Sequence, residues 1–260
     1  VFVVRGFLPL LIVWLSAPSI GPVNAFIATF SNDPTVLEAI ENSSPMLLVG
    51  GGTFMVFLFF HWLFLEPKHF CLVGERFFAR QGVWFYAVVS ILLTGIVWLA
   101  LQVDSFMAFG VVVGSTAFFI THGFKQNAEA NEEKLMEKGR SDISKILYLE
   151  VIDATFSIDG VLGAFAFTLS VPLILLGNGL GAIVVRQLTL GNIDRIKQYR
   201  FLKNGAMYSI FCLGFVMLMD AFGVHIPSWV SPVVTFAVVG FFFLKSRQDI
   251  RASEVSQSSV

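Results

Sequence analysis

M-L-L-V-G-G-G-T-F-M-V-F-L-F-F-H-W-L-F-L, residues 46–65, is a stretch of the chain without a single charged side chain. A helix needs about 20 mostly apolar residues to cross the roughly 30 Å hydrocarbon core of a bilayer. Residues 46–65 have that length, so they predict a membrane-spanning helix.

Similar stretches recur along the chain. Apolar runs lie at 83–101, 104–122, 146–169, 171–189, 203–222 and 229–245, and a shorter run lies at 1–16. Of the 260 residues, 56% are hydrophobic and only 13% are charged, against about 25% charged residues in a soluble domain. We therefore expect an all-α fold, a polytopic transmembrane bundle of about eight spans.

Charge and cysteine content exclude two other classes of protein. The formal net charge of −1 leaves no basic excess to neutralise phosphates, so we expect no nucleic-acid partner. Cys71 and Cys212 are far apart in sequence and form neither a disulfide framework nor a C-x-x-C metal site.

The basic residues divide the chain into parts. All of them except Arg5 and Arg186 lie in or beside alternate connecting segments, which the positive-inside rule places in the cytoplasm. The predicted parts are a first transmembrane half, a cytoplasmic linker, a second transmembrane half and a cytoplasmic tail, at 1–122, 123–145, 146–245 and 246–260.

Three acidic residues lie inside one apolar run, K-I-L-Y-L-E-V-I-D-A-T-F-S-I-D-G, residues 145–160. They are Glu150, Asp153 and Asp159. One carboxylate at the centre of a membrane helix costs roughly 2.5–3.5 kcal/mol, and three cost about 7–10 kcal/mol. We therefore expect partner helices, water or bound cations to compensate these charges, as at an intramembrane functional site.

The spacing of these acids predicts the kind of ligand. Glu150, Asp153 and Ser157 share one helical face, whereas Asp159 points to the other side unless the helix breaks at Gly160 and Gly163. Carboxylate and hydroxyl oxygens suit Mg²⁺, Ca²⁺ or Mn²⁺. His61, His122 and His225 are interpreted as packed or interfacial side chains rather than ligands.

Two segments resemble each other in opposite orientations. V-V-R-G-F-L-P-L around Arg5 is similar to V-V-R-Q-L-T-L around Arg186, and the predicted topology runs the two segments in opposite directions. This pattern is typical of an inverted repeat. Because the sequence begins inside an apolar run, we interpret it as starting partway through a helix.

The acidic motif E-V-I-D-A-T-F-S-I-D-G, residues 150–160, resembles the second-half signature E-x-x-D-x-x-F-A-x-D-S of the TerC family of integral membrane proteins, in particular its uncharacterised bacterial branch with longer chains. Glu150, Asp153, Phe156 and Asp159 match, whereas Ser157 and Gly160 depart by small residues. The first-half signature, E-x-x-L-S-x-D-N, has no counterpart.

The resemblance implies a transporter-like fold of two inverted repeats in the bacterial inner membrane. It also implies the handling of a divalent metal, chiefly manganese export, with tellurite resistance as an older label. The metal ligands would be Glu150, Asp153 and Asp159, with Ser157 as an auxiliary oxygen and Arg186 and Arg5 balancing the charge. The expected partners are the lipid bilayer and the transported metal ion, with no permanently bound cofactor.

Other interpretations stay open. An intramembrane hydrolase would need two aspartates on facing helices, whereas here they share one helix, so we expect no enzyme. A membrane scaffold or assembly and stress-response factor of the TerC type, without transport, would use 123–145 as a docking surface. Gly110–Gly114 and Gly177–Gly181 permit close helix packing, either within the bundle or in a homo-oligomer.

Overall fold

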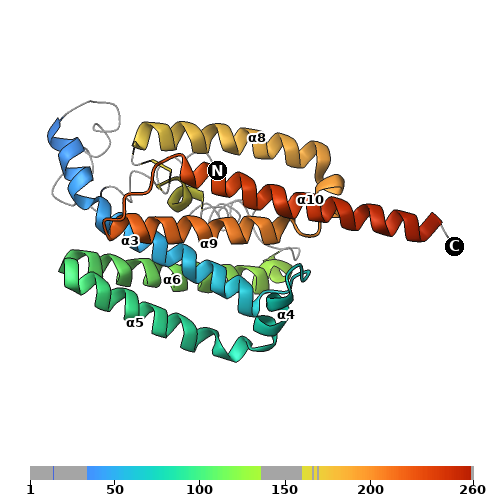
Figure 1. The fold of residues 1–260 in the computed structure, drawn as a ribbon, viewed down its shortest axis with the longest axis horizontal. Coiled ribbons are helices and arrows are strands. Elements are labelled where there is room, and N and C mark those ends of the chain that lie inside the picture. The colour runs from blue at the N-terminus through green and yellow to red at the C-terminus, as the bar shows by residue number, and fades with distance from the viewer. Residues whose placement is uncertain (1–13, 15–33, 136–159, 166, 169, 259–260) are drawn as a thin grey trace.

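The computed structural model describes residues 14, 34–135, 160–165, 167–168 and 170–258, and this part of the chain is helical apart from its turns. It contains no strand (Figure 1). The elements are α3 (Pro34–Leu65), α4 (Val73–Arg80), the short 3₁₀ helix η2 (Gly82–Trp84), α5 (Phe85–Val103), α6 (Ser105–Leu135), α8 (Val171–Gln198), α9 (Leu202–Ala221) and α10 (Val230–Ser258).

Five helical segments are long and apolar enough to cross a membrane: Ser43–Leu65, Gly82–Val103, Ser105–Phe124, Leu202–Ala221 and Val230–Arg251. They confirm the predicted spans at 46–65, 83–101, 104–122, 203–222 and 229–245. The architecture is therefore that of a multi-pass membrane protein.

The remaining predicted spans, at 1–16, 146–169 and 171–189, are not among these five segments. The predicted span at 171–189 lies within helix α8, and the described side chains there form the apolar segment Val171–Val184, while the rest of the predicted span is not described closely enough to test it. The run at 1–16 lies outside the described residues except for Trp14, and so does most of 146–169. The total of eight spans and the inverted repeat stay predictions.

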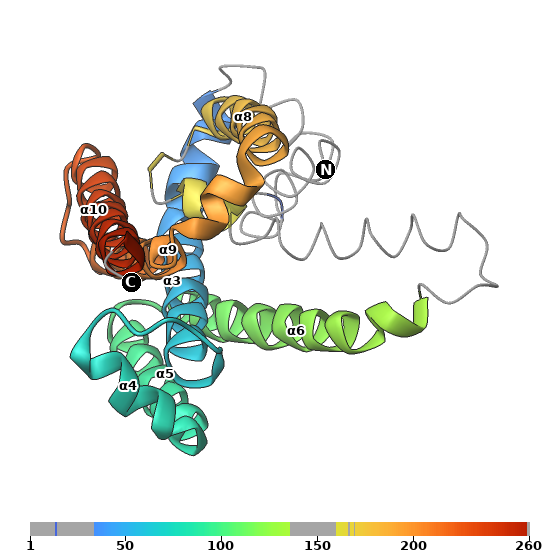
Figure 2. The same ribbon diagram turned by 90° about the vertical axis from the view of Figure 1, so that its right-hand side faces the viewer.

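Helix α3 is the central element of the described bundle. It packs against α6 and α9, while α5 packs on α6 and α10 on α9. Val49, Phe54, Phe57 and Trp62 of α3 are at most 1% exposed. Figures 1 and 2 agree that α8 lies on one side of this central layer and α5 on the other.

Glycines bring α3 close to both neighbours. A methyl group on Gly114 of α6 would collide with the carbonyl group of Gly50, and one on Gly52 would lie 2.9 Å from the carbonyl oxygen of Gly214 in α9. Small residues that let backbones approach are a general device of membrane helix packing. The Gly110–Gly114 pair thus serves packing within this chain.

The outer helices present apolar side chains to their surroundings. Ile91 and Trp98 of α5 are 72% and 62% exposed, and Phe236 of α10 is 79% exposed. Such exposure is unfavourable in water and favourable in lipid. α5 and α10 therefore have the surface that lipid-facing helices require.

Two helices continue beyond their apolar parts. α6 runs on from Phe124 to Leu135, into the predicted linker 123–145, and α10 runs on to Ser258, into the predicted tail 246–260. Neither continuation contains Gly or Pro, so the sequence provides no stop signal at the membrane surface.

Candidate functional site

Most of the predicted site lies outside the described residues. Glu150, Asp153, Ser157, Asp159 and Arg5 all belong to that part of the chain. Arg186 is in the described helix α8, but its side chain is also outside the described part.

The described chain resumes immediately after Asp159. Residues 160–165 are helical across both Gly160 and Gly163, so the helix is unbroken between these glycines. The break comes later, where the N–H groups of Phe167 and Thr168 both donate to the carbonyl of Ala164, at 3.0 and 3.2 Å. Helix α8 then begins at Val171.

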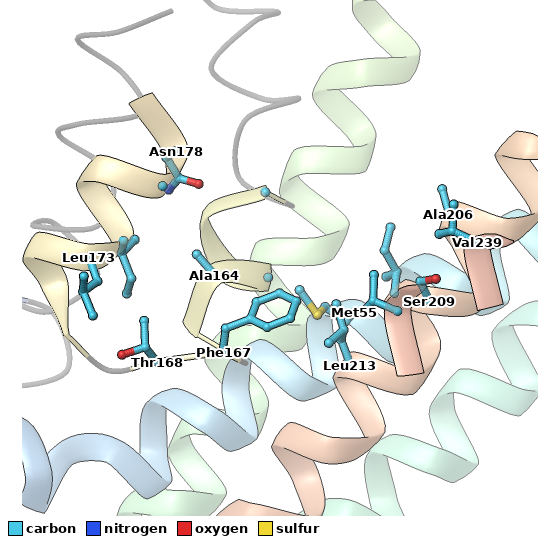
Figure 3. A pocket seen from close by; sticks show the side chains of 16 residues that line it. Met55, Ala164, Phe167, Thr168, Leu173, Asn178, Ala206, Ser209, Leu213 and Val239 are labelled. Carbon is cyan, nitrogen blue, oxygen red and sulfur yellow. The ribbon is translucent and has the colours of Figure 1, made fainter. Parts of the chain in front are cut away.

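A pocket with a volume of about 550 Å³ lies beside this helical segment. Its wall is formed by the segment 160–168, the first turns of α8, one face of α9, and parts of α3 and α10. Figure 3 shows Phe167 next to Met55, with Asn178 of α8 on one side and Ser209 of α9 on the other. The lining is mostly apolar.

The polar groups of the pocket are hydroxyls and one amide. Ser209 Oγ donates to Gly205 O at 2.9 Å, Thr235 Oγ1 donates to Ser231 O at 2.9 Å, and Thr168 Oγ1 accepts from the N–H of Ser170 at 3.1 Å. The Asn178 Nδ2 has no hydrogen-bond partner within the described part. These side chains offer neutral oxygen and nitrogen atoms but no charge.

The described residues of the pocket thus lack the ligands that a divalent cation requires. No His, Cys, Asp or Glu lines it, and no cluster of three or more such residues suited to a metal ion occurs in the described ranges. A cation in this pocket would need carboxylates from the rest of the chain. The predicted acidic segment ends at the residue before Gly160, which lines the pocket.

Sequence reasoning missed Asn178. It lies in the run V-P-L-I-L-L-G-N-G-L-G-A-I-V, residues 171–184, where it is the single side chain with an amide or charged group. A lone amide in an apolar membrane segment is a recognisable signal of a polar role. In the structure Asn178 lines the pocket, so the polar role that the sequence indicates belongs to this pocket.

A second polar cluster lies at the end of the bundle where α3 ends and α9 begins. The carboxylate of Glu75, in α4, is only 1% exposed and accepts hydrogen bonds from the Cys71 N–H at 2.7 Å and from Asn204 Nδ2 at 3.1 Å to each oxygen. Asn204 Nδ2 also donates to His69 O at 3.0 Å. These bonds compensate the burial of the carboxylate.

Three lysines surround that cluster. Lys203 forms an ion pair with Glu66 at 2.7 Å, and Lys245 donates to Cys71 O at 3.1 Å. Lys68 donates to the carbonyls of Trp62 and Leu63. Burial lowers the pKa of Lys68 to about 8, although Glu75 and Glu66 partly oppose this shift. Burial likewise raises the pKa of the Cys71 thiol.

Two of the histidines interpreted from the sequence as packed or interfacial, His61 and His122, lie packed in the helix interface, as predicted. The rings of His61 (α3) and His122 (α6) are 3.6 Å apart between centroids, and His61 also contacts Phe85 and Phe118 edge-on or tilted. Neither ring nitrogen of His61 has a hydrogen-bond partner in the described part; Nδ1 is 3.7 Å from Glu66 Oε1. His225, in contrast, is exposed near Asp220.

Comparison with known proteins identifies the family of the chain. No curated protein and no solved structure matches the chain. The resemblance to the TerC family therefore stays a prediction. The model of one protein family matches residues 1–253, nearly the whole chain. The chain belongs to this family, whose description reads "Protein of unknown function (DUF475)".

Proposed function

We propose that the chain is a membrane transporter for a divalent metal cation, and that it exports manganese. The observation that carries the proposal is the group of three acidic residues, Glu150, Asp153 and Asp159, within one apolar run. Three uncompensated carboxylates in a bilayer cost about 7–10 kcal/mol, and a bound divalent cation offsets that cost directly.

The pocket supports this proposal by its position in the chain. Asp159 is followed directly by Gly160, and Gly160, Gly163 and Ala164 line the pocket. An acidic segment that leads into the wall of a pocket is well placed to supply ligands to a cation there. The neutral pocket wall would then contribute oxygen atoms without adding charge.

The roles of the residues follow from their chemistry. Glu150, Asp153 and Asp159 provide hard oxygen ligands, and Ser157 provides an auxiliary oxygen. Arg186 and Arg5 balance the acidic charge when the metal has left. Exchange of the metal for protons on the carboxylates would couple export to a proton gradient. The basic segments would face the cytoplasm of a bacterial cell, with the protein in the inner membrane.

The test is manganese efflux in a manganese-sensitive host that expresses the full-length protein. We expect Asp153→Asn and Asp159→Asn each to abolish efflux, because the amide keeps the size of the side chain but removes its charge. Asp104→Asn is the matched control, since Asp104 is exposed in the turn between α5 and α6. Efflux at the wild-type rate by the two site variants would refute the proposal.

One observation favours the second candidate, a TerC-type scaffold or assembly factor without transport. Helix α6 continues from Phe124 to Leu135 beyond its apolar part, so the first part of the predicted linker 123–145 is a helix on which a partner could dock. A partner that co-purifies with the wild type, is lost on deleting 126–142 and is kept in Glu150→Gln would support this role. A protein that acts only as a metal transporter would not need a partner bound through 126–142.

A further inference from the structure

Helix α4 (Val73–Arg80), of sequence V-G-E-R-F-F-A-R, is a short amphipathic helix between two candidate spans. Glu75 is buried against the bundle, whereas Arg76, Phe77 and Arg80 are exposed. The preceding candidate span ends at Leu65 and the following one begins at Gly82, and α4 connects them at one end of the bundle (Figure 1). Its outer face therefore meets the bilayer interface.

The orientation of α4 is fixed by its buried side. The Glu75 carboxylate is held by Asn204 of α9 and by the Cys71 N–H, and Lys245 of α10 donates to the Cys71 carbonyl. Rolling α4 about its axis would break these bonds and leave a carboxylate unpaired in the protein interior. The exposed face is thus a permanent surface.

Exposed aromatic side chains lie on α4 and on the residues beside it in the chain. Phe77 is 63% exposed, Phe70 44% and Trp84 61%. Aromatic residues are enriched where membrane proteins meet the headgroup region, because their rings tolerate both apolar and polar surroundings. In water the same side chains would form an unfavourable exposed patch.

The positive charge of Arg76 and Arg80 favours an anionic ligand on this surface. Arg76 and Arg80 have no carboxylate partner in the described part of the chain, and Arg76 lies 5.7 Å from the Phe70 ring centroid. The two acidic residues of the segment 66–82 are already engaged: Glu75 with Asn204 and Cys71, and Glu66 with Lys203. Two guanidinium groups, one of them beside an aromatic ring, match a lipid with an anionic headgroup and acyl chains.

We propose that Phe70, Arg76, Phe77, Arg80 and Trp84, the α4 surface, bind the headgroup of an anionic phospholipid. The arginines contact the phosphate while the aromatic rings enter the interface beside the acyl chains. The inference does not depend on the proposed transport function, because it uses no residue of the predicted metal site.

The experiment titrates fluorescent phosphatidylglycerol, or phosphatidylcholine with the same acyl chains, into the full chain in a neutral maltoside detergent and follows anisotropy. Each basic group near an anionic lipid surface contributes about 1 kcal/mol, which is about fivefold in affinity. We expect Arg76→Gln/Arg80→Gln to weaken phosphatidylglycerol binding on the order of 25-fold and to leave phosphatidylcholine binding unchanged. Phe77→Ser should weaken both lipids.

The matched control is Arg247→Gln/Arg251→Gln, which removes two exposed basic residues from α10. It should change the phosphatidylglycerol affinity by less than about threefold. Equal weakening by both double variants would overturn the proposal, because the attraction would then be a diffuse effect of net charge. Equal binding of the two lipids by the wild type would also overturn it.

Two further measurements distinguish a loss of lipid binding from unfolding and from a change in oligomeric state. Thermal unfolding shows whether each variant is folded, and light scattering shows its oligomeric state. If Arg76→Gln/Arg80→Gln dissociates an oligomer of the wild type, the α4 surface contacts a second copy of the chain and the lipid proposal is wrong.

Discussion

The hydrogen bonds between Asn204 and Glu75 give a sharp prediction about stability. Asn204→Leu removes one donor that serves both carboxylate oxygens of Glu75 and the carbonyl of His69. Both side chains are 1% exposed, so water cannot replace the lost bonds without opening the bundle. A hydrogen bond to a charged group contributes about 1.5–3 kcal/mol and a neutral one about 0.5–1.5 kcal/mol. We therefore expect Asn204→Leu to lower the free energy of unfolding by about 2–4 kcal/mol.

The assay is unfolding of the full chain in maltoside micelles by added sodium dodecyl sulfate, followed by far-ultraviolet circular dichroism. Ser209→Ala is the control on the same helix, since the buried Ser209 hydroxyl donates only to the backbone of its own helix. It should cost no more than about 1 kcal/mol.

A double-mutant cycle isolates the interaction itself. Glu75→Leu in the Asn204→Leu background removes a carboxylate that has already lost its bonds to Asn204, so the two changes should couple by about 1.5–3 kcal/mol. Additive effects of Asn204→Leu and Glu75→Leu would refute the reasoning, because they would show that the two groups do not depend on each other.

Three other predictions concern packing and charge. Gly114→Ala should destabilise by about 1–3 kcal/mol because its methyl group collides with the Gly50 carbonyl, whereas Gly177→Ala, with open space around it, should stay within about 1 kcal/mol of wild type in the same titration. His61→Phe should stabilise by about 1 kcal/mol, since it keeps the aromatic contacts and removes two buried nitrogens without hydrogen-bond partners in the described part; a clear loss of stability would contradict this. Because the pKa of Lys68 is lowered from 10.5 to about 8, the unfolded chain binds more protons than the folded chain between these pH values. Wild type should therefore gain stability relative to Lys68→Met as pH rises from 8 to 10.5, and thermal unfolding across this window measures the difference.

The sequence was sufficient to place the spans because burial in lipid requires a continuous apolar run, and such a run is visible without knowledge of neighbours. Residues 46–65 and 203–222 illustrate this, since both predicted spans match described helices. Helix ends were harder to predict. α6 passes Phe124 without interruption because nothing in the following sequence stops a helix in water.

The polar clusters could not be predicted from the sequence, because their members come together only in the folded bundle. Glu75 is one of several charged residues in a connecting segment, and its sequence gives no sign of burial. Its partner Asn204 is 129 positions away, so the pair exists only because the folded bundle brings α4 next to the start of α9. Asn178 was detectable in principle as a lone amide in an apolar run. The acidic motif, the strongest functional signal in the sequence, lies outside the described residues and stays a prediction.

Helix α9 connects the pocket to the buried cluster and limits how the pocket can change shape. At one end Asn204 is bonded to Glu75, and further along Gly214 lies in contact with Gly52 of α3. Ser209, between these two anchors, lines the pocket. A tilt of α9 large enough to open the pocket would break the hydrogen bonds at the first anchor or separate the backbones at the second.

The opposite wall has no comparable anchor in the described part of the chain. A methyl group on Gly177, Gly179 or Gly181 of α8 would meet nothing within 4 Å. A change in pocket volume should therefore come from α8, against a fixed layer of α3, α6 and α9. If transport proceeds by alternating access, cross-linking α9 to α3 should leave it intact, whereas cross-linking α8 to α9 should stop it.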